Sequence, residues 1–158
     1  MATITAALSV SSDITTGLSI NKSMTMTKAG THNGLERTSG LQRKYLTAAN
    51  QVDLIQGAAG VVADMTVGAS SAAKIYIKYL ESDTSKYITL GFGTASTGAT
   101  ATANDSTGTA TFELGRLYGD EWMIIPWDGT SASGDITVLP SVATTADEAI
   151  VEYIVFFD

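Results

Sequence analysis

The chain has 158 residues, which is the size of one domain with a hydrophobic core of its own. It contains no cysteine, so disulfides, thiolate catalysis and cysteine-based zinc sites are excluded. Nine basic against sixteen acidic residues give a formal net charge of −7. This balance argues against a nucleic-acid or anionic-membrane partner, because either surface requires concentrated lysine and arginine.

The N-terminal residues lack a basic region followed by a continuous apolar stretch, so we expect no signal peptide. No apolar run approaches the roughly 18 residues that a membrane span requires. Charged residues make up only 16% of the chain, while Thr, Ser, Ala and Gly are abundant. This composition favours a β protein, because threonine favours strands and Gly and Ser punctuate them.

Apolar residues occupy alternate positions from Leu18 to Met26, with Lys22 as the exception, and this period of two predicts a strand. We expect residues 1–35 to form an extended arm or edge strands. Residues 41–55 allow two interpretations. Apolar residues recur at helical spacing at Leu41, Tyr45, Ala48, Val52 and Ile55, which allows a helix. The alternation in residues 51–54 predicts a strand instead.

The β-rich runs 74–80 and 86–92 flank the short polar segment 81–85, a pattern that predicts a hairpin. Residues 94–111 are low in complexity and predict a long loop or an exposed hairpin tip. Further strands are expected from Phe112, over 122–126 and over 135–139. Pro126 and Pro140 suit strand ends, because proline cannot donate to a sheet ladder.

Residues 149–157 are β-branched or aromatic on every side, which favours a buried strand. A capping box of Thr145 and Glu148 leaves a helix as the alternative. About eight short strands with turn signals predict an all-β fold, an antiparallel β-sandwich or jelly roll with long loops, built as a single domain over 1–158.

Residues with catalytic potential are few. His32, the one histidine, is expected on an exposed turn, and no glycine-rich phosphate motif or nucleophile elbow is present. Asp120 and Glu121 beside a tryptophan are a weak glycosidase signal, and Asp128 and Asp135 are a weak calcium signal. Acidic residues are ordinary in turns, so we predict no enzyme, no metal site and no cofactor.

The segment 122–127 is apolar on both faces of the expected strand, so something must cover each face. Either another layer of the same chain or a partner protein can do this. Tryptophan, tyrosine and arginine dominate interface energetics. Our interface candidates are therefore Arg116, Tyr118, Trp122 and Trp127, and core packing is the alternative for the two tryptophans.

Several segments also carry a family resemblance: Tyr76–Tyr79, Lys86–Leu90, Leu114–Trp127, Val151–Val155, and near the start Ser11–Ile14, Lys28–Thr31 and Gly34–Leu41. In these segments the chain resembles small virion structural proteins of tailed bacteriophages, particularly marine and cyanobacterial phages. The likeness covers most of the chain except the region around 94–111.

The resemblance implies a β-sandwich built into a virion in many copies, with no enzymatic role. We expect a capsid decoration or cement protein that contacts the major capsid protein or other virion proteins and forms a homo-oligomer, for which a trimer is one option. No nucleic acid or membrane is expected as a partner. The alternative is a tail, collar or fibre-associated component, including a receptor- or carbohydrate-binding module.

Overall fold

The computed structural model describes residues 4–12, 19–26, 35, 37–46, 51–57, 61–62, 65–66, 73–93, 112–128, 134–141 and 149–157. These residues form antiparallel strands and turns, without an α-helix, which confirms the predicted all-β class. The described residues accordingly contain no helix that could span a membrane.

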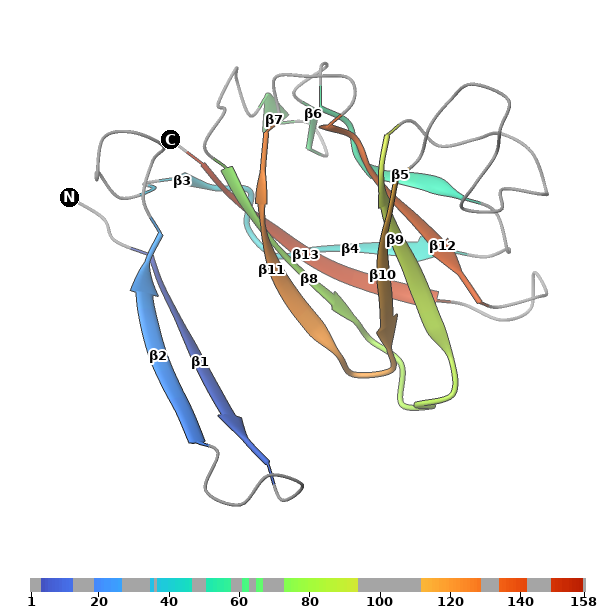
Figure 1. The fold of residues 1–158 in the computed structure, drawn as a ribbon. Helices are drawn as coiled ribbons and strands as arrows, with labels where there is room; N and C mark the ends of the chain where they lie inside the picture. The colour runs from blue at the N-terminus through green and yellow to red at the C-terminus, as the bar shows by residue number, and fades with distance from the viewer. Residues whose placement is uncertain are drawn as a thin grey trace.

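Two antiparallel sheets face one another across the core (Figure 1). The five-stranded sheet consists of β11 (Trp122–Trp127), β8 (Ala73–Tyr79), β13 (Ala149–Phe157) and β3 (Arg37–Thr38), with β4 (Gln42–Leu46) also paired to β13. The four-stranded sheet has the order β10 (Phe112–Tyr118), β9 (Tyr87–Phe92), β12 (Ile136–Pro140) and β5 (Val52–Ile55). A separate short pair is formed by β6 (Val61–Val62) and β7 (Met65–Thr66).

The core lies between the inward faces of these two sheets. In β8 and β13, buried and partly buried residues alternate along the whole strand, as expected for strands with one face on the core. The four-stranded sheet contributes buried residues from the opposite side, including Ile88, Leu90 and Val138. The final segment 149–157 is therefore a strand, as predicted, and it is central to its sheet.

The predicted hairpin of residues 74–92 is wrong. β8 pairs with β11 and β13, whereas β9 pairs with β10 and β12, so the chain crosses from one sheet to the other between Tyr79 and Tyr87. The physical reason is that both strands bury one apolar face, and these faces meet across the core. The strands therefore belong to different layers rather than lying side by side.

Of the two interpretations of residues 41–55, the strand is confirmed. Residues 42–46 form β4 at the edge of the five-stranded sheet, and residues 52–55 form β5 at the edge of the four-stranded sheet. Backbone pairing to β13 and β12 therefore outweighs the helical spacing of Leu41 and Tyr45, whose side chains are exposed.

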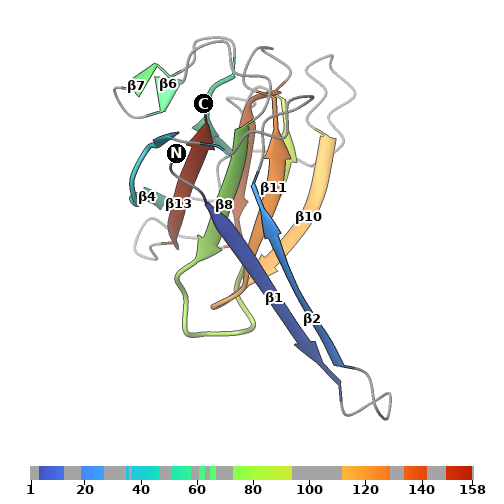
Figure 2. The ribbon, with the colours of Figure 1, turned by 90° about the vertical axis from the view of Figure 1, so that its left-hand side faces the viewer.

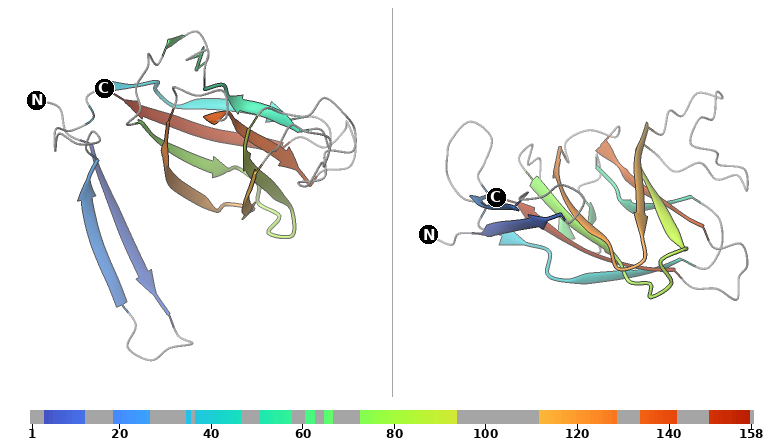
Figure 3. Two further views of the ribbon diagram at one scale, coloured as in Figure 1. Left: turned by 45° about the horizontal axis from the view of Figure 1, so that its top comes forward. Right: turned by 60° about the horizontal axis from the view of Figure 1, so that its bottom comes forward.

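The N-terminal residues form a hairpin of their own, β1 (Thr5–Ser11) paired with β2 (Ser19–Thr25). It stands apart from the two packed sheets (Figure 1), and a side view shows it crossing in front of β8 and β11 (Figure 2). Its far end reaches beyond the body of the molecule (Figure 3). The backbone bonds Met26 N to Ile4 O, 2.8 Å, and Leu35 N to Met26 O, 3.0 Å, hold its base.

Some predictions fall outside the described residues. These are the turn around His32, the loop at 94–111, the interior of the 128–135 loop and the capping residues Thr145 and Glu148.

Candidate interaction surfaces

The turn between β10 and β11 separates the predicted interface residues. Tyr118 ends β10 in the four-stranded sheet, and Trp122 begins β11 in the five-stranded sheet. Within the turn, Glu121 N donates to Tyr118 O at 3.0 Å, and Tyr118 N donates to Glu121 Oε2 at 2.8 Å. Asp120 adopts a positive φ of 66°, a conformation that aspartate tolerates better than most residues. The candidates therefore lie on two different sheets.

The first surface is the Tyr87 cluster, made of Arg116, Tyr87 and Tyr118 on β9 and β10. The Arg116 guanidinium carbon lies 4.4 Å from the centroid of the Tyr87 ring, a cation–π geometry. The Tyr87 and Tyr118 ring centroids are 5.5 Å apart and tilted by 56°. Tyr118 is 39% exposed, so this cluster presents a preorganised aromatic and cationic group to the solvent.

The second surface is the outer face of the five-stranded sheet. Trp122 is 48% exposed, and its ring lies 6.1 Å from that of Tyr76. The registers place Ile124, Tyr76 and Ile154 side by side across β11, β8 and β13. All three are only partly buried, so they form an apolar row across the middle of the face. Burial raises the pKa of the Tyr76 hydroxyl above its ordinary value.

Charged pairs line the same face beside the apolar row. Lys78 Nζ lies 2.6 Å from Asp120 Oδ1, and the hydrogen bond between them raises the pKa of Lys78. Arg43 contacts Glu152 at 3.0 Å, across the β4–β13 register. The Asp120 side chain is 78% exposed although it is paired, so its carboxylate can accept a further donor.

Trp127 lies in the core. It is 3% exposed, and its Nε1 donates to the Gly134 carbonyl oxygen at 2.5 Å. The predicted alternation of β11 is confirmed: Met123, Ile125 and Trp127 are the more buried set, and Trp122 and Pro126 are exposed. Core packing, the alternative that the sequence left open, therefore applies to Trp127, which we remove from the candidate interface.

The carboxylates considered for catalysis or metal binding have structural contacts. Glu121 and Asp120 belong to the β10–β11 turn and its ion pair. Asp135 is 6% exposed and accepts a hydrogen bond from Gly57 N at 2.5 Å, which ties β12 to the end of β5. No group of three or more His, Cys, Asp or Glu side chains within the described ranges is placed to hold a metal ion.

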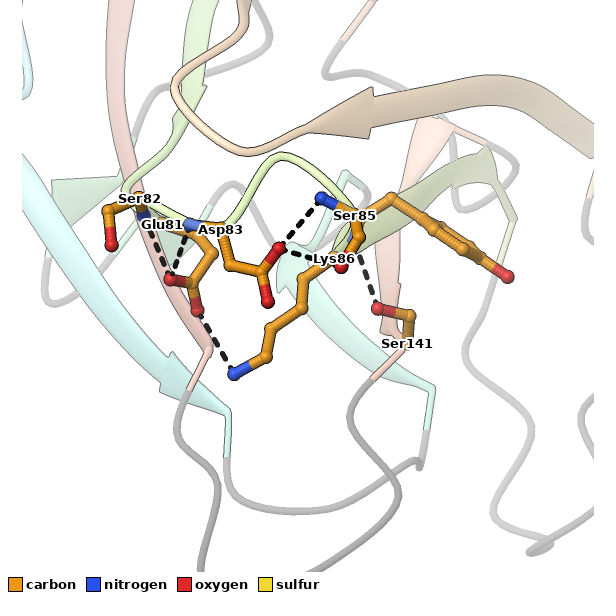
Figure 4. A network of polar contacts seen from close by, with 7 residues as sticks. Glu81, Ser82, Asp83, Ser85, Lys86 and Ser141 are labelled. Atoms are coloured by element: carbon orange, nitrogen blue, oxygen red, sulfur yellow. Dashed lines mark hydrogen bonds and ion pairs between the residues drawn. The ribbon is translucent and has the colours of Figure 1, made fainter.

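A polar network organises the crossing between β8 and β9 (Figure 4). Glu81 Oε1 accepts from Ser82 N and Asp83 N, at 2.8 and 3.0 Å, and Asp83 Oδ1 accepts from the backbone and hydroxyl of Ser85, at 2.9 and 2.6 Å. Lys86 Nζ lies 3.6 Å from Glu81 Oε2. Hydrogen bonds from Asp83 N to Glu81, and from Ser85 to Asp83, lower the pKa values of both carboxyls.

A groove lies between the N-terminal hairpin and β11, and the sequence pattern does not predict it. It has a volume of about 430 Å³, and its walls include Ala6, Leu8, Lys22 and Met24 on the hairpin and Trp122, Met123 and Ile124 on β11. Two sequence patterns belong to the walls of this groove: the apolar alternation of residues 18–26 and the two apolar faces of residues 122–127. The pattern did not tell which surfaces meet.

Comparisons of the chain with protein-family models, with curated proteins and with solved structures found no match.

Proposed function

We propose that this chain is a structural protein of a bacteriophage virion, a capsid decoration or cement protein that bridges subunits of the shell. The observation that carries the proposal is the placement of two solvent-facing aromatic surfaces on opposite sheets of one sandwich. The Tyr87 cluster lies on the four-stranded sheet, and Trp122 and Tyr76 lie on the outer face of the five-stranded sheet. A bridging protein requires two such surfaces on a stiff body.

The mechanism is mechanical. Each contact buries aromatic and apolar area, and the sandwich between the contacts transmits load from one neighbour to the next. Repetition on a lattice multiplies modest affinity at each site, because the second contact of a bridging molecule forms at high effective concentration. The acidic excess of the chain favours repulsion between decorated particles in solution. None of these roles requires catalysis, a metal or a cofactor.

The test is the copy number in purified virions, measured by quantitative mass spectrometry against the major capsid protein. We expect hundreds of copies that scale with the number of capsid subunits. A count of a few to a few dozen would place the protein in the tail, collar or fibres. Absence from the particle would overturn the virion role.

A second candidate function is carbohydrate or receptor binding by a tail or fibre component. The exposure of Trp122, at 48%, and Tyr118, at 39%, favours it, because sugar rings stack on exposed aromatic side chains. A glycan array with the folded protein tests this, with Trp122→Ala and Tyr118→Ala as variants. Binding lost in either variant would support the alternative, and the absence of any bound glycan would count against it.

A further inference from the structure

The N-terminal hairpin has one apolar and one polar face. In the β1–β2 register, Ala6 lies opposite Met24, Leu8 opposite Lys22, and Val10 opposite Ile20. Side chains of directly paired residues share a face, so these six form one face, and Thr, Ser, Ala and Asn residues form the other. The large apolar side chains are exposed: Leu8 by 49%, Val10 by 37%, Ile20 by 39% and Met24 by 51%.

A hairpin of this kind requires a cover. Isolated two-stranded hairpins are at best marginally stable in water, and a contiguous exposed apolar face marks an interaction site. The buried core cluster includes no residue of β1 or β2. At the base of the hairpin, the backbone bonds through Met26 and Leu35 are accompanied by burial of both side chains, which are 2% and 0% exposed. Beyond this base, the large apolar side chains of the face stay exposed within one chain.

The outer face of the five-stranded sheet is the matching surface. It carries the exposed Trp122 and the row of Ile124, Tyr76 and Ile154, and it already faces the hairpin across the groove of about 430 Å³. Seven residues per hairpin strand span about 24 Å, close to the about 20 Å of the six-residue β11. The two surfaces agree in length and in apolar character, yet in a single copy a gap separates them.

One charged side chain lies on the apolar face of the hairpin. Lys22 is the single charged residue of β1 and β2, and the segment that connects the two strands contains Asp13. Among the described residues no ion pair involves Lys22. Asp120, which is 78% exposed, lies beside Trp122 at the end of the matching surface. Asp120 keeps its ion pair with Lys78, and its exposed carboxylate can accept Lys22 of a docked arm as a further donor.

We infer that the hairpin is an assembly arm whose apolar face docks on the outer face of the five-stranded sheet of a second copy of this chain. A hairpin face is about 24 Å long and about 10 Å wide. Reciprocal docking of two arms removes on the order of 1,000 Å² from water with both sides counted, which is where specific interfaces begin. Exchange between two copies reaches this area, whereas one arm alone provides half of it.

This inference does not depend on the virion role. Self-association through the arm covers the outer face with Trp122 and Tyr76, so that this face joins two copies of the chain, and the Tyr87 cluster on the opposite sheet remains for another partner. A protein absent from virions can still form the arm-exchanged assembly. A virion protein that is monomeric in solution would contradict the arm exchange without touching the virion role.

The first experiment compares molar mass across concentrations by light scattering and analytical ultracentrifugation. We expect the unmodified chain to associate and Leu8→Glu to raise the dissociation constant at least tenfold. Ser9→Glu is the matched control, because it adds the same charge to the next residue on the polar face and is expected to associate like the unmodified chain. A monomeric chain, or equal effects of the two variants, would overturn the inference.

The second experiment locates the docking surface. Because the chain has no cysteine, single variants Val10→Cys and Ile154→Cys each carry one thiol. Mixing the two under mild oxidation is expected to give a covalent dimer of unlike chains, and Ser9→Cys in place of Val10→Cys is expected to give far less. Disulfide formation only between two Val10→Cys chains would show that hairpins pack on hairpins, and it would overturn docking on the sheet.

Discussion

The hydroxyl of Tyr79 lies in the apolar core without a hydrogen-bond partner among the described residues. Tyr79 is 0% exposed and faces inward from β8. Burial raises its pKa, with smaller contributions from Glu81 and Asp83. A buried hydroxyl that has lost its water without gaining a partner destabilises the fold, because its desolvation is not offset. Shape, rather than hydrogen bonding, explains why a ring of this size fits here.

We therefore expect Tyr79→Phe to raise the free energy of unfolding by about 1 kcal/mol, since it removes the unsatisfied hydroxyl and keeps the ring. Tyr153→Phe is the matched control on the neighbouring strand. The Tyr153 hydroxyl donates to Gln42 Oε1 at 3.2 Å, so its loss is expected to lower stability by about 1 kcal/mol. Urea denaturation measures both, and destabilisation by Tyr79→Phe would show that its hydroxyl has a partner.

Position 119 requires a glycine because neighbouring backbone atoms leave no room for a side chain, and not because of its backbone conformation. A Cβ built on it would lie 2.6 Å from the Asp83 carbonyl oxygen and 2.7 Å from that of Glu81. Both are backbone atoms of the β8–β9 crossing, so neither can rotate away. We expect Gly119→Ala to lower the free energy of unfolding by about 1–3 kcal/mol, the usual cost of overpacking. Thr84→Ala, at an exposed position of the same crossing, is the control, and equal midpoints in urea for the two variants would contradict the steric argument.

At the scale of the element, alternation in the sequence predicted strands well and their partners poorly. The inward set of β8 follows largely from alternation, whereas β13 is apolar on both faces and its inward set depends on the sheets around it. The same pattern does not reveal which strand lies beside which. For this reason the runs before and after residues 81–85 predict a hairpin from the sequence, although the two strands belong to opposite sheets. Distant pairing, such as β13 with β4, decides the topology.

The candidate surfaces were predictable to a similar extent. The two apolar faces of 122–127 correctly indicated that Trp122 and Trp127 point to opposite sides of β11. Which side faces the core depends on the neighbouring sheet, so the sequence could not tell core from surface. Tyr87, which Arg116 and Tyr118 contact, was not singled out, because cross-strand neighbours follow from the β9–β10 register and its bulge.

The crossing at residues 81–86 is expected to contribute to acid sensitivity. The pKa values of Glu81 and Asp83 are lowered in the folded state, so the unfolded chain binds more protons as the pH falls. Their contribution is present above the ordinary values, 4.5 and 3.8, and is lost as the pH falls through the folded values. We expect Glu81→Gln to be less stable than the unmodified chain at neutral pH, with the difference shrinking below pH 4.5. A difference independent of pH would contradict the role of the charge.

For the whole molecule, tyrosine burial sets an alkaline limit. Burial raises the pKa values of Tyr76, Tyr79 and Tyr153 above the ordinary 10.0, so the folded chain holds protons that the unfolded chain releases. This contribution to stability is complete below pH 10 and is lost as the pH rises above it. Thermal unfolding from neutral pH upward is expected to show a falling midpoint above pH 10. In Tyr79→Phe the fall is expected to be smaller, and an unchanged fall would contradict the assignment to Tyr79.

The arm and the sandwich are expected to differ in how they open. β13 pairs with three strands and lines the core, whereas β1 and β2 pair only with each other among the described strands. Amide hydrogens of β1 and β2 are therefore expected to exchange much faster than those of β13 in dilute protein.

If the arm docks on a second copy, the protection of its amide hydrogens rises with protein concentration, because association stabilises the docked form by mass action. Hydrogen exchange followed by mass spectrometry over a hundredfold range of concentration measures this. We expect protection of the arm to increase at least tenfold in the unmodified chain and in Ser9→Glu, but not in Leu8→Glu, while β13 stays unchanged. Arm protection that is independent of concentration would mean that the hairpin is stabilised within its own chain.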